Sequence, residues 1–100
     1  MRLVLDAMGG DHAPEQIVKG ALEAAADIKG TIILVGDPDR IRPHLGATPP
    51  ANVTIHPASE VIEMDDKPTE ALRKKKDSSI AVAARLVKDG EGDVLIAAGN

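Results

Sequence analysis

The chain has no cysteine and no phenylalanine, tryptophan or tyrosine among its 100 residues. Without cysteine there is no disulfide, no thiolate metal ligand and no cysteine nucleophile, and such a composition is compatible with a reducing compartment. Without aromatic rings, the core must be built from Ile, Leu, Val, Ala and Met, whose side chains each bury less apolar surface than a ring. We therefore expect a thin core.

Long hydrophobic runs and a strong charge bias are also missing. No apolar run approaches the ~20 residues that span a bilayer, and Asp6 follows only three apolar residues, so we expect neither a signal peptide nor a membrane span. A net charge of −4 does not favour a nucleic-acid partner. The motifs G-x-G-x-x-G and G-x-x-x-x-G-K-[ST] are both absent, which weakens dinucleotide and P-loop interpretations.

Segments with strand and helix periodicity alternate along the chain. Strands are expected at 3–5, 31–35, 52–56 and 93–97, and helices at 14–27, 38–44, 68–75 and 78–89. Pro14 suits the first position of the first helix, and Asp77 or Ser78 suits the N-cap of the last. This order predicts an α/β fold with right-handed crossovers and a mostly parallel sheet, in which ligands bind beyond the carboxyl ends of the strands. The loops after Leu5 and Ala97 are therefore candidates for one site.

The loop Met8-Gly9-Gly10-Asp11-His12 joins the first strand to the first helix. Its glycines would let a phosphate approach the backbone, and the helix N-terminus offers unpaired N–H groups to an anion. A tight turn that needs glycine for its dihedral angles explains the same residues, and a lone histidine near a helix start is usually a surface or capping group. Both interpretations stay open at this point.

Four adjacent cations, Arg73 to Lys76, precede Asp77-Ser78-Ser79 and the last predicted helix. A solvated basic turn is one interpretation. Cations at a helix N-terminus oppose the helix dipole, however, at a cost of ~0.3–1 kcal/mol each. A bound phosphate would reverse that sign, because ammonium groups, hydroxyls and helix N–H groups all bind phosphate oxygens. The residues alone do not decide between the two.

The remaining polar segments carry weaker signals. Ala98-Gly99-Asn100 is typical of a strand-end turn, although the amide of Asn100 is also suited to donate to a developing oxyanion. The acidic stretch at 60–66 matches no oxygen-ligand motif, so we expect a solvated loop rather than a metal site. His44 and His56 are expected to be loop or strand-end residues.

Taken together, the motifs resemble the amino-terminal part of the PlsX-type phosphate acyltransferases. They are Asp6-Ala7-Met8-Gly9-Gly10-Asp11-His12-Ala13-Pro14, Val35-Gly36-Asp37, Arg73 with Lys75-Lys76-Asp77-Ser78-Ser79, and Ala98-Gly99-Asn100. Their order and spacing match over essentially the whole chain. The sequence departs from the family pattern at Ala97, where serine is common, and it ends where Thr-Gly would normally continue.

The resemblance implies a three-layer α/β/α fold related to phosphotransacetylases and the isocitrate dehydrogenase group. It implies a cytoplasmic homodimer, with peripheral membrane association through the remaining portion, that converts acyl carrier protein thioester and inorganic phosphate to acyl phosphate for phospholipid synthesis. On this reading residues 1–100 are the amino-terminal segment of a longer acyltransferase whose carboxyl-terminal portion is absent, and the segment alone is expected to be inactive.

The resemblance also implies site roles. Phosphate itself attacks the thioester, so neither a protein nucleophile nor a cofactor or metal is needed. Lys76 and Asn100 are the expected catalytic residues. The expected phosphate- and substrate-binding residues are Gly9, Gly10, Asp11, His12, Lys75, Ser78, Ser79 and Gly99. The alternative is a non-catalytic anion- or nucleotide-binding α/β module.

Overall fold

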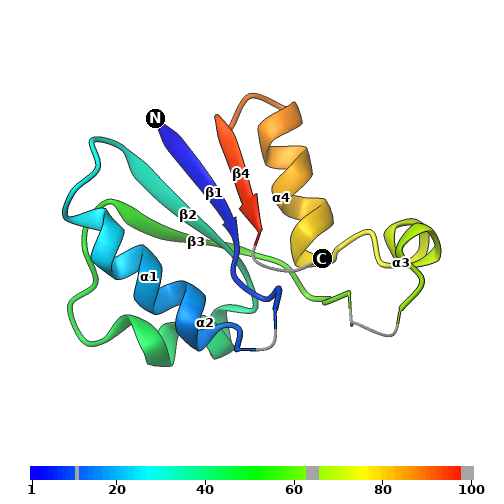
Figure 1. Cartoon of the computed structure of the whole chain (residues 1–100), viewed down its shortest axis with the longest axis horizontal. Coiled ribbons are helices and arrows are strands. Elements are labelled where there is room, and N and C mark those ends of the chain that lie inside the picture. Colours follow the sequence, from blue (N-terminus) through cyan, green and yellow to red (C-terminus); the bar gives the residue numbers. More distant parts are fainter. Residues whose placement is uncertain (11, 63–65, 98–100) are drawn as a thin grey trace.

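A computed structural model describes residues 1–10, 12–62 and 66–97 of the chain (Figure 1). Within these ranges the strands are β1 Arg2–Asp6, β2 Thr31–Gly36, β3 Val53–Pro57 and β4 Val94–Ala97. The helices are α1 Glu15–Ala25, α2 Pro38–Leu45, α3 Pro68–Lys74 and α4 Ser79–Lys88. Every predicted strand and helix is therefore confirmed. Helix α1 begins at Glu15, one residue later than expected, with Pro14 at the N-cap, and His44 lies in the last turn of α2 rather than in a loop.

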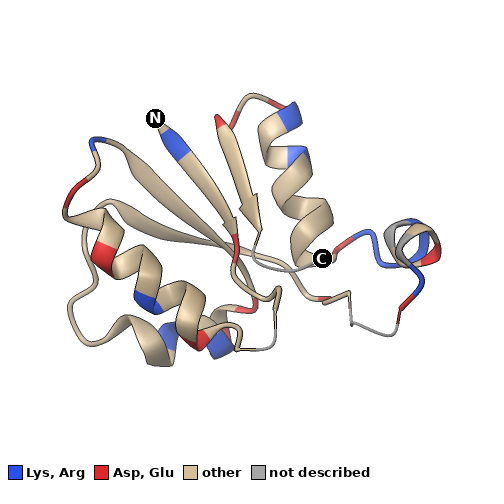
Figure 2. Cartoon of the chain, in the orientation of Figure 1, with Lys and Arg blue, Asp and Glu red and all other residues tan. Residues whose placement is uncertain are grey.

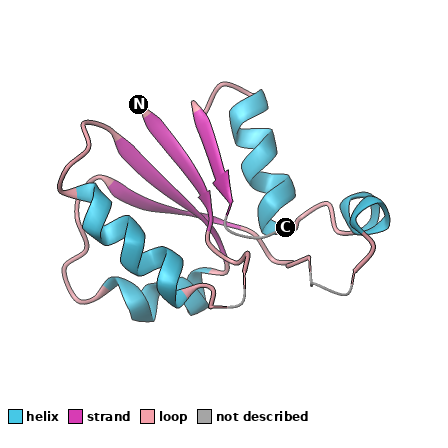
Figure 3. Ribbon diagram, viewed as in Figure 1, coloured by secondary structure: helices cyan, strands magenta, loops and turns pink. Residues whose placement is uncertain are grey.

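The strands form one sheet in the order β3-β2-β1-β4, and every pair within the described residues is parallel. Helices α1 and α2 cover one face, whereas α4 lies on the other and α3 stands outside this sandwich (Figure 3). The expected three-layer α/β/α arrangement is thus confirmed. None of the described helices has the length and apolar character needed to cross a membrane.

Two apolar clusters hold the layers together, one on each face of the sheet. Ile32 and Leu34 of β2 belong to the cluster beneath α1 and α2, and Val35 belongs to the cluster beneath α4. Successive side chains of a strand point to opposite faces, so a continuously apolar strand can fill both clusters. The run Thr31–Val35 therefore becomes an interior strand of the sheet.

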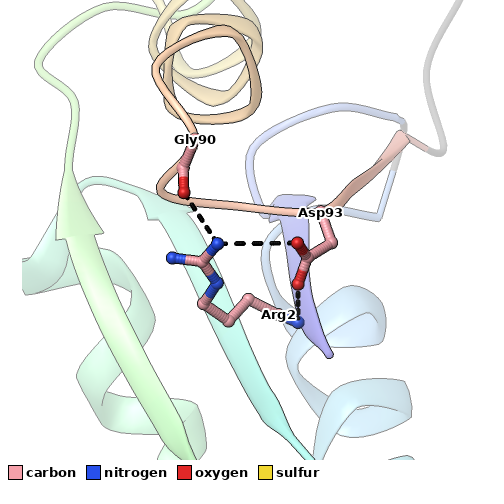
Figure 4. A network of polar contacts seen from close by, with 3 residues as sticks. All are labelled: Arg2, Gly90 and Asp93. Carbon is pink, nitrogen blue, oxygen red and sulfur yellow. Dashed lines mark hydrogen bonds and ion pairs between the residues drawn. The ribbon is translucent and has the colours of Figure 1, made fainter.

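A polar network joins the start of β1 to the turn that precedes β4 (Figure 4). The Arg2 backbone N–H donates to Asp93 Oδ2 at 2.7 Å, and Arg2 Nη2 donates to the Gly90 carbonyl at 2.7 Å and to Asp93 Oδ1 at 3.5 Å. The hydrogen bond from the Arg2 backbone, and then the guanidinium, hold the pKa of the Asp93 carboxyl below its ordinary value of 3.8. The network thereby locks β4 in register beside β1.

The network predicts a specific acid sensitivity. A carboxyl whose folded-state pKa is depressed adds stability that is present above its unfolded pKa and is lost as the pH falls through its folded pKa. We expect Asp93→Asn to lower the free energy of unfolding near neutral pH, with the difference from the unsubstituted chain shrinking as the pH falls from neutral through 3.8 and then through the lower folded-state pKa. Urea unfolding across this range measures it. Asp39→Asn is the control. Its carboxylate is 93% exposed, so its removal is expected to change the free energy of unfolding little at any pH. Parallel acid profiles for Asp93→Asn and the unsubstituted chain would contradict the prediction.

Candidate functional site

The loops that follow β1, β2 and β3 meet at the carboxyl edge of the sheet. The Ala7 N–H donates to the Val35 carbonyl at 2.9 Å, which ties the loop after β1 to the end of β2. The Ala58 N–H donates to the Gly36 carbonyl at 2.9 Å, which ties the loop after β3 to the same place. In Figure 1 the strand arrowheads converge on this edge. It is the position at which open α/β sheets bind ligands.

The loop after β1 is a tight, internally bonded turn. Asp6 is buried, and its Oδ1 accepts a hydrogen bond from the Met8 N–H at 3.0 Å. Gly10 has φ 95°, in the left-handed region that favours glycine, so the turn needs this glycine for its backbone. Met8 is packed so closely that a Cβ at Gly36 would lie 2.6 Å from Met8 Cγ. The expectation that a glycine is needed for the backbone of this turn is therefore confirmed at Gly10, and Asp6 is a residue that the sequence reasoning did not single out.

The phosphate role expected of this loop is not decided by the same geometry. Gly9 is half-buried and Gly10 is exposed, so both lie where a ligand has access to the backbone. His12 is exposed and its carbonyl accepts from the Gln16 N–H at 3.1 Å, at the entry to α1. Asp11 lies outside the described residues. The described part of the loop is thus compatible with either role.

The N-terminus of α4 is buried against the carboxyl edge. Ser78 is the N-cap, and its Oγ accepts from the Ala81 N–H at 3.3 Å. Ser78 is 0% exposed and Ser79 is 2% exposed, although both are polar. The expectation that Asp77 or Ser78 caps this helix is confirmed for Ser78. Two serine side chains and the N-terminal backbone of α4 are therefore held at the same edge of the sheet as the glycine turn.

A set of contacts between Ser59, Glu60 and Asp77–Ser79, called here the loop clasp, holds α4 in this place. The Glu60 N–H donates to the Asp77 carbonyl at 3.1 Å, and the Ser79 N–H donates to the Glu60 carbonyl at 3.0 Å. The Ser59 N–H and Oγ both donate to Asp77 Oδ2, at 2.8 Å and 2.5 Å. The Asp77 N–H points back to Glu60 Oε1 at 3.4 Å. Sequence reasoning missed Ser59 and placed Glu60 in a solvated acidic loop, because their partner Asp77 lies 18 and 17 positions away.

The clasp sets the ionisation of Asp77. The Ser59 hydroxyl, and next the Ser59 backbone N–H, lower the pKa of the Asp77 carboxyl below its ordinary value of 3.8, and Arg85 and His56 act in the same direction. Hydrogen bonds to the charged form stabilise that form. The ionised Asp77 carboxylate is therefore held by its two hydrogen bonds from Ser59.

The basic run divides into parts with different surroundings (Figure 2). Arg73 and Lys74 lie in the last turn of α3, where cations complement the helix dipole. Lys75 Nζ donates to Asp66 Oδ2 at 2.8 Å and to the Val61 carbonyl at 2.9 Å. Lys76 is exposed. The sequence argument that four cations oppose the dipole of α4 is thus wrong for the first two, because they end the preceding helix.

Contacts on either side of Lys76 fix its backbone. The Lys76 carbonyl accepts a hydrogen bond from Arg85 Nη1 at 2.8 Å, so a side chain of α4 holds the turn that precedes this helix. The ion pair of Lys75 with Asp66 also corrects the expected solvated acidic loop: Asp66 pairs with a lysine, and Glu60 belongs to the clasp. Residues 63–65 lie outside the described part. Lys76 is accordingly the exposed lysine placed directly before the clasped helix start.

Gly99 and Asn100 lie outside the described residues, so their expected roles are not placed by the structure; Ala97 ends β4 beside Asp6. A surface hollow of about 430 Å³ lies between the end of α2 and the start of β3, lined by Arg42, Leu45, Gly46, Pro49, Val53 and Ile55. It is remote from the carboxyl edge and contains none of the expected residues.

The fold and the gathered loops define an α/β protein with a ligand-type site at the carboxyl edge of a parallel sheet. A family model described as "Fatty acid synthesis protein" matches residues 1–100, and the chain belongs to this family. The resemblance to PlsX-type phosphate acyltransferases is thereby confirmed at the level of the family.

Relatives with similar sequences carry the name phosphate acyltransferase. The chain is 55% identical over 101 residues to that of Desulfitobacterium hafniense, covering 100% of this chain and 30% of the relative. It is 56% identical over 103 residues to that of Heliobacterium modesticaldum (100% and 31%) and 51% identical over 102 residues to that of Myxococcus xanthus (100% and 29%). The chain therefore spans about 30% of the length of the curated relatives it matches.

Proposed function

We propose that this chain is the amino-terminal α/β segment of a phosphate acyltransferase and forms the phosphate side of its active site. The enzyme transfers an acyl group from acyl carrier protein thioester to inorganic phosphate and releases acyl phosphate for phospholipid synthesis. Identity of 55% with a phosphate acyltransferase over the whole chain supports the activity. The observation that supports this location of the phosphate site is the buried N-terminus of α4, where the loop clasp holds Ser78 and Ser79 at the carboxyl edge of the sheet.

The reaction needs positioning and charge more than a protein nucleophile. A phosphate oxygen attacks the thioester carbonyl carbon, a C–O bond forms, and the carbonyl oxygen carries the negative charge of a tetrahedral intermediate. The C–S bond then breaks, the sulfur leaves with the bonding pair and takes a proton, and acyl phosphate remains. The protein contributes alignment, neutralisation of the phosphate and donors to the oxyanion.

The described residues divide these tasks in the proposal. Lys76 supplies the exposed cation, and the Ser78–Ser79 start of α4 supplies the positive end of the helix dipole and the Ser79 hydroxyl to phosphate oxygens. Lys75, already paired with Asp66, adds positive charge to the same turn. Gly9, Gly10 and His12 line the neighbouring wall.

Three roles in the proposal lie outside the described residues. Asn100 donates to the oxyanion, and Asp11 and Gly99 line the site. Homodimer formation, a cytoplasmic location and peripheral membrane association belong to the same proposal and are supported by the resemblance alone.

The experiment replaces Lys76 by alanine in the complete enzyme. Losing one charge-assisted contact to phosphate, worth about 1.5–3 kcal/mol, raises the KM for phosphate about 10- to 100-fold. Acyl phosphate formation is measured with phosphate varied at fixed acyl carrier protein thioester, and Ser79→Ala is assayed in parallel. Lys74→Ala, which removes a neighbouring exposed lysine from α3, is the matched control and keeps the unsubstituted KM.

Unchanged phosphate kinetics in both Lys76→Ala and Ser79→Ala, with folding verified by circular dichroism, would contradict the proposed phosphate-binding site.

The rival function is a non-catalytic anion- or nucleotide-binding module. Titration with phosphate, acyl phosphate and nucleotides, followed by NMR shifts, separates the two, since selective nucleotide binding would favour the rival.

A further inference from the structure

Asp77 raises a question that the proposed function leaves open. It stands between Lys76 and the N-cap Ser78, so it places a carboxylate beside the proposed phosphate site. Aspartate caps helices about as well as serine, and it pairs readily with lysine. In the structure Ser78 is the N-cap instead, and Asp77 Oδ2 accepts both donors of Ser59.

We propose that Ser59 is a positioning residue that holds the Asp77 carboxylate away from the start of α4 and so keeps the phosphate site open. The inference rests on the proposed function, because it needs an anion to bind at Lys76 and Ser79. Without the Ser59 hydroxyl, the Asp77 carboxylate keeps only the bond from the Ser59 backbone N–H and is freer to turn toward the Lys76 ammonium. It would then compete with phosphate as a built-in anion.

The contacts support a holding role for the side chain. Apart from Ser59, the backbone pairing of the clasp is a single bridge between Glu60 and Ser78, with one hydrogen bond on each side. Two further donors from Ser59 converge on one carboxylate oxygen, the backbone N–H at 2.8 Å and the side-chain Oγ at 2.5 Å, and the Oγ bond is the one that the side chain adds. Ser59 is itself exposed, so its removal leaves the apolar clusters intact.

The charges around Asp77 explain why the carboxylate needs a fixed direction. Arg85 of α4 and His56 of β3 also lower the pKa of the Asp77 carboxyl, and Glu60 faces the Asp77 N–H. Arg85 is occupied with the Lys76 carbonyl at 2.8 Å. The two Ser59 donors therefore provide the direct hydrogen bonds that the structure records for the Asp77 carboxylate.

The test uses the complete acyltransferase with Ser59→Ala, Asp77→Asn and the double variant. Ser59→Ala removes the hydroxyl and keeps the backbone N–H, and it is expected to raise the KM for phosphate about 3- to 10-fold with kcat nearly unchanged, the size of losing one ordinary hydrogen bond. The double variant returns the KM to within about twofold of the unsubstituted enzyme, because the competing charge is gone. Ser59→Thr keeps the hydroxyl and keeps the KM. Thr48→Ala, an exposed hydroxyl at the other edge of the sheet, is the control.

The outcomes separate this inference from the proposed function. If Ser59→Ala leaves the phosphate KM unchanged while Lys76→Ala raises it, the inference is overturned and the proposed function stands. If Ser59→Ala raises the KM and the double variant does not recover, Ser59 has only a structural role, and the competing-anion inference is wrong. If neither Lys76→Ala nor Ser79→Ala affects phosphate kinetics, both proposals fail together.

Discussion

Replacing Leu34 by alanine is expected to lower the free energy of unfolding of this chain by about 2–5 kcal/mol. Leu34 is 0% exposed and lies in the middle of β2, an interior strand of the sheet. The loss combines the transfer free energy of the side chain with a cavity that the surrounding strands fill only in part. Because a small domain has only about 5–15 kcal/mol of stability in total, the variant is expected to be partly unfolded at body temperature.

Urea unfolding followed by far-ultraviolet circular dichroism measures this loss. Ile96→Ala is the control. It removes an aliphatic side chain of comparable size, and Ile96 on β4 is 46% exposed. Its cost is expected to be a fraction of that of Leu34→Ala. Equal costs for the two substitutions would show that the cluster beneath α1 is not the stabilising core.

Adding a single methyl group at Gly92 is expected to have the second largest effect on the free energy of unfolding. Gly92 is buried in the turn before β4, and a Cβ there would lie 2.3 Å from Val4 Cγ2. Val4 is 0% exposed, so its side chain has no open space into which to retreat. Overpacking of this kind costs about 1–3 kcal/mol, and we expect Gly92→Ala to lose this much stability.

The same substitution at Gly20 is the matched control and has the opposite expected sign. Gly20 lies within α1, and a Cβ there meets nothing within 4 Å. Alanine in a helix interior is favoured over glycine by about 0.5–1 kcal/mol, so Gly20→Ala is expected to raise the thermal midpoint. Thermal unfolding of both variants in one experiment measures the contrast, and a stabilised Gly92→Ala would contradict the packing argument.

The basic run shows how the structure changed the argument for a site. From its residues alone, the run is four cations in front of a helix. In the structure Arg73 and Lys74 end α3, and Lys75 is paired with Asp66 across nine positions. The case for an anion therefore rests on Lys76 and the buried serines, and on the family to which the chain belongs.

By itself, the sequence determined the elements and their order. The continuous apolar run of β2, the period of α1 and α4, and the serine N-cap of α4 are local patterns, and local patterns report strands, helices and caps directly. The alternation of strands and helices was enough to predict a parallel sheet and the edge at which its loops gather. Its motifs also indicated the family.

Only the tertiary structure decided which polar side chains meet. Asp77 with Ser59, Lys75 with Asp66 and Arg2 with Asp93 are joined across 18, 9 and 91 positions. No periodicity or spacing records such pairs, because each forms only when the folded chain brings together residues from different elements or loops. For the same reason the sequence left Asp77 and Ser78 as alternative caps, whereas in the fold Ser78 is the cap and Asp77 is an anion held by a serine from another loop.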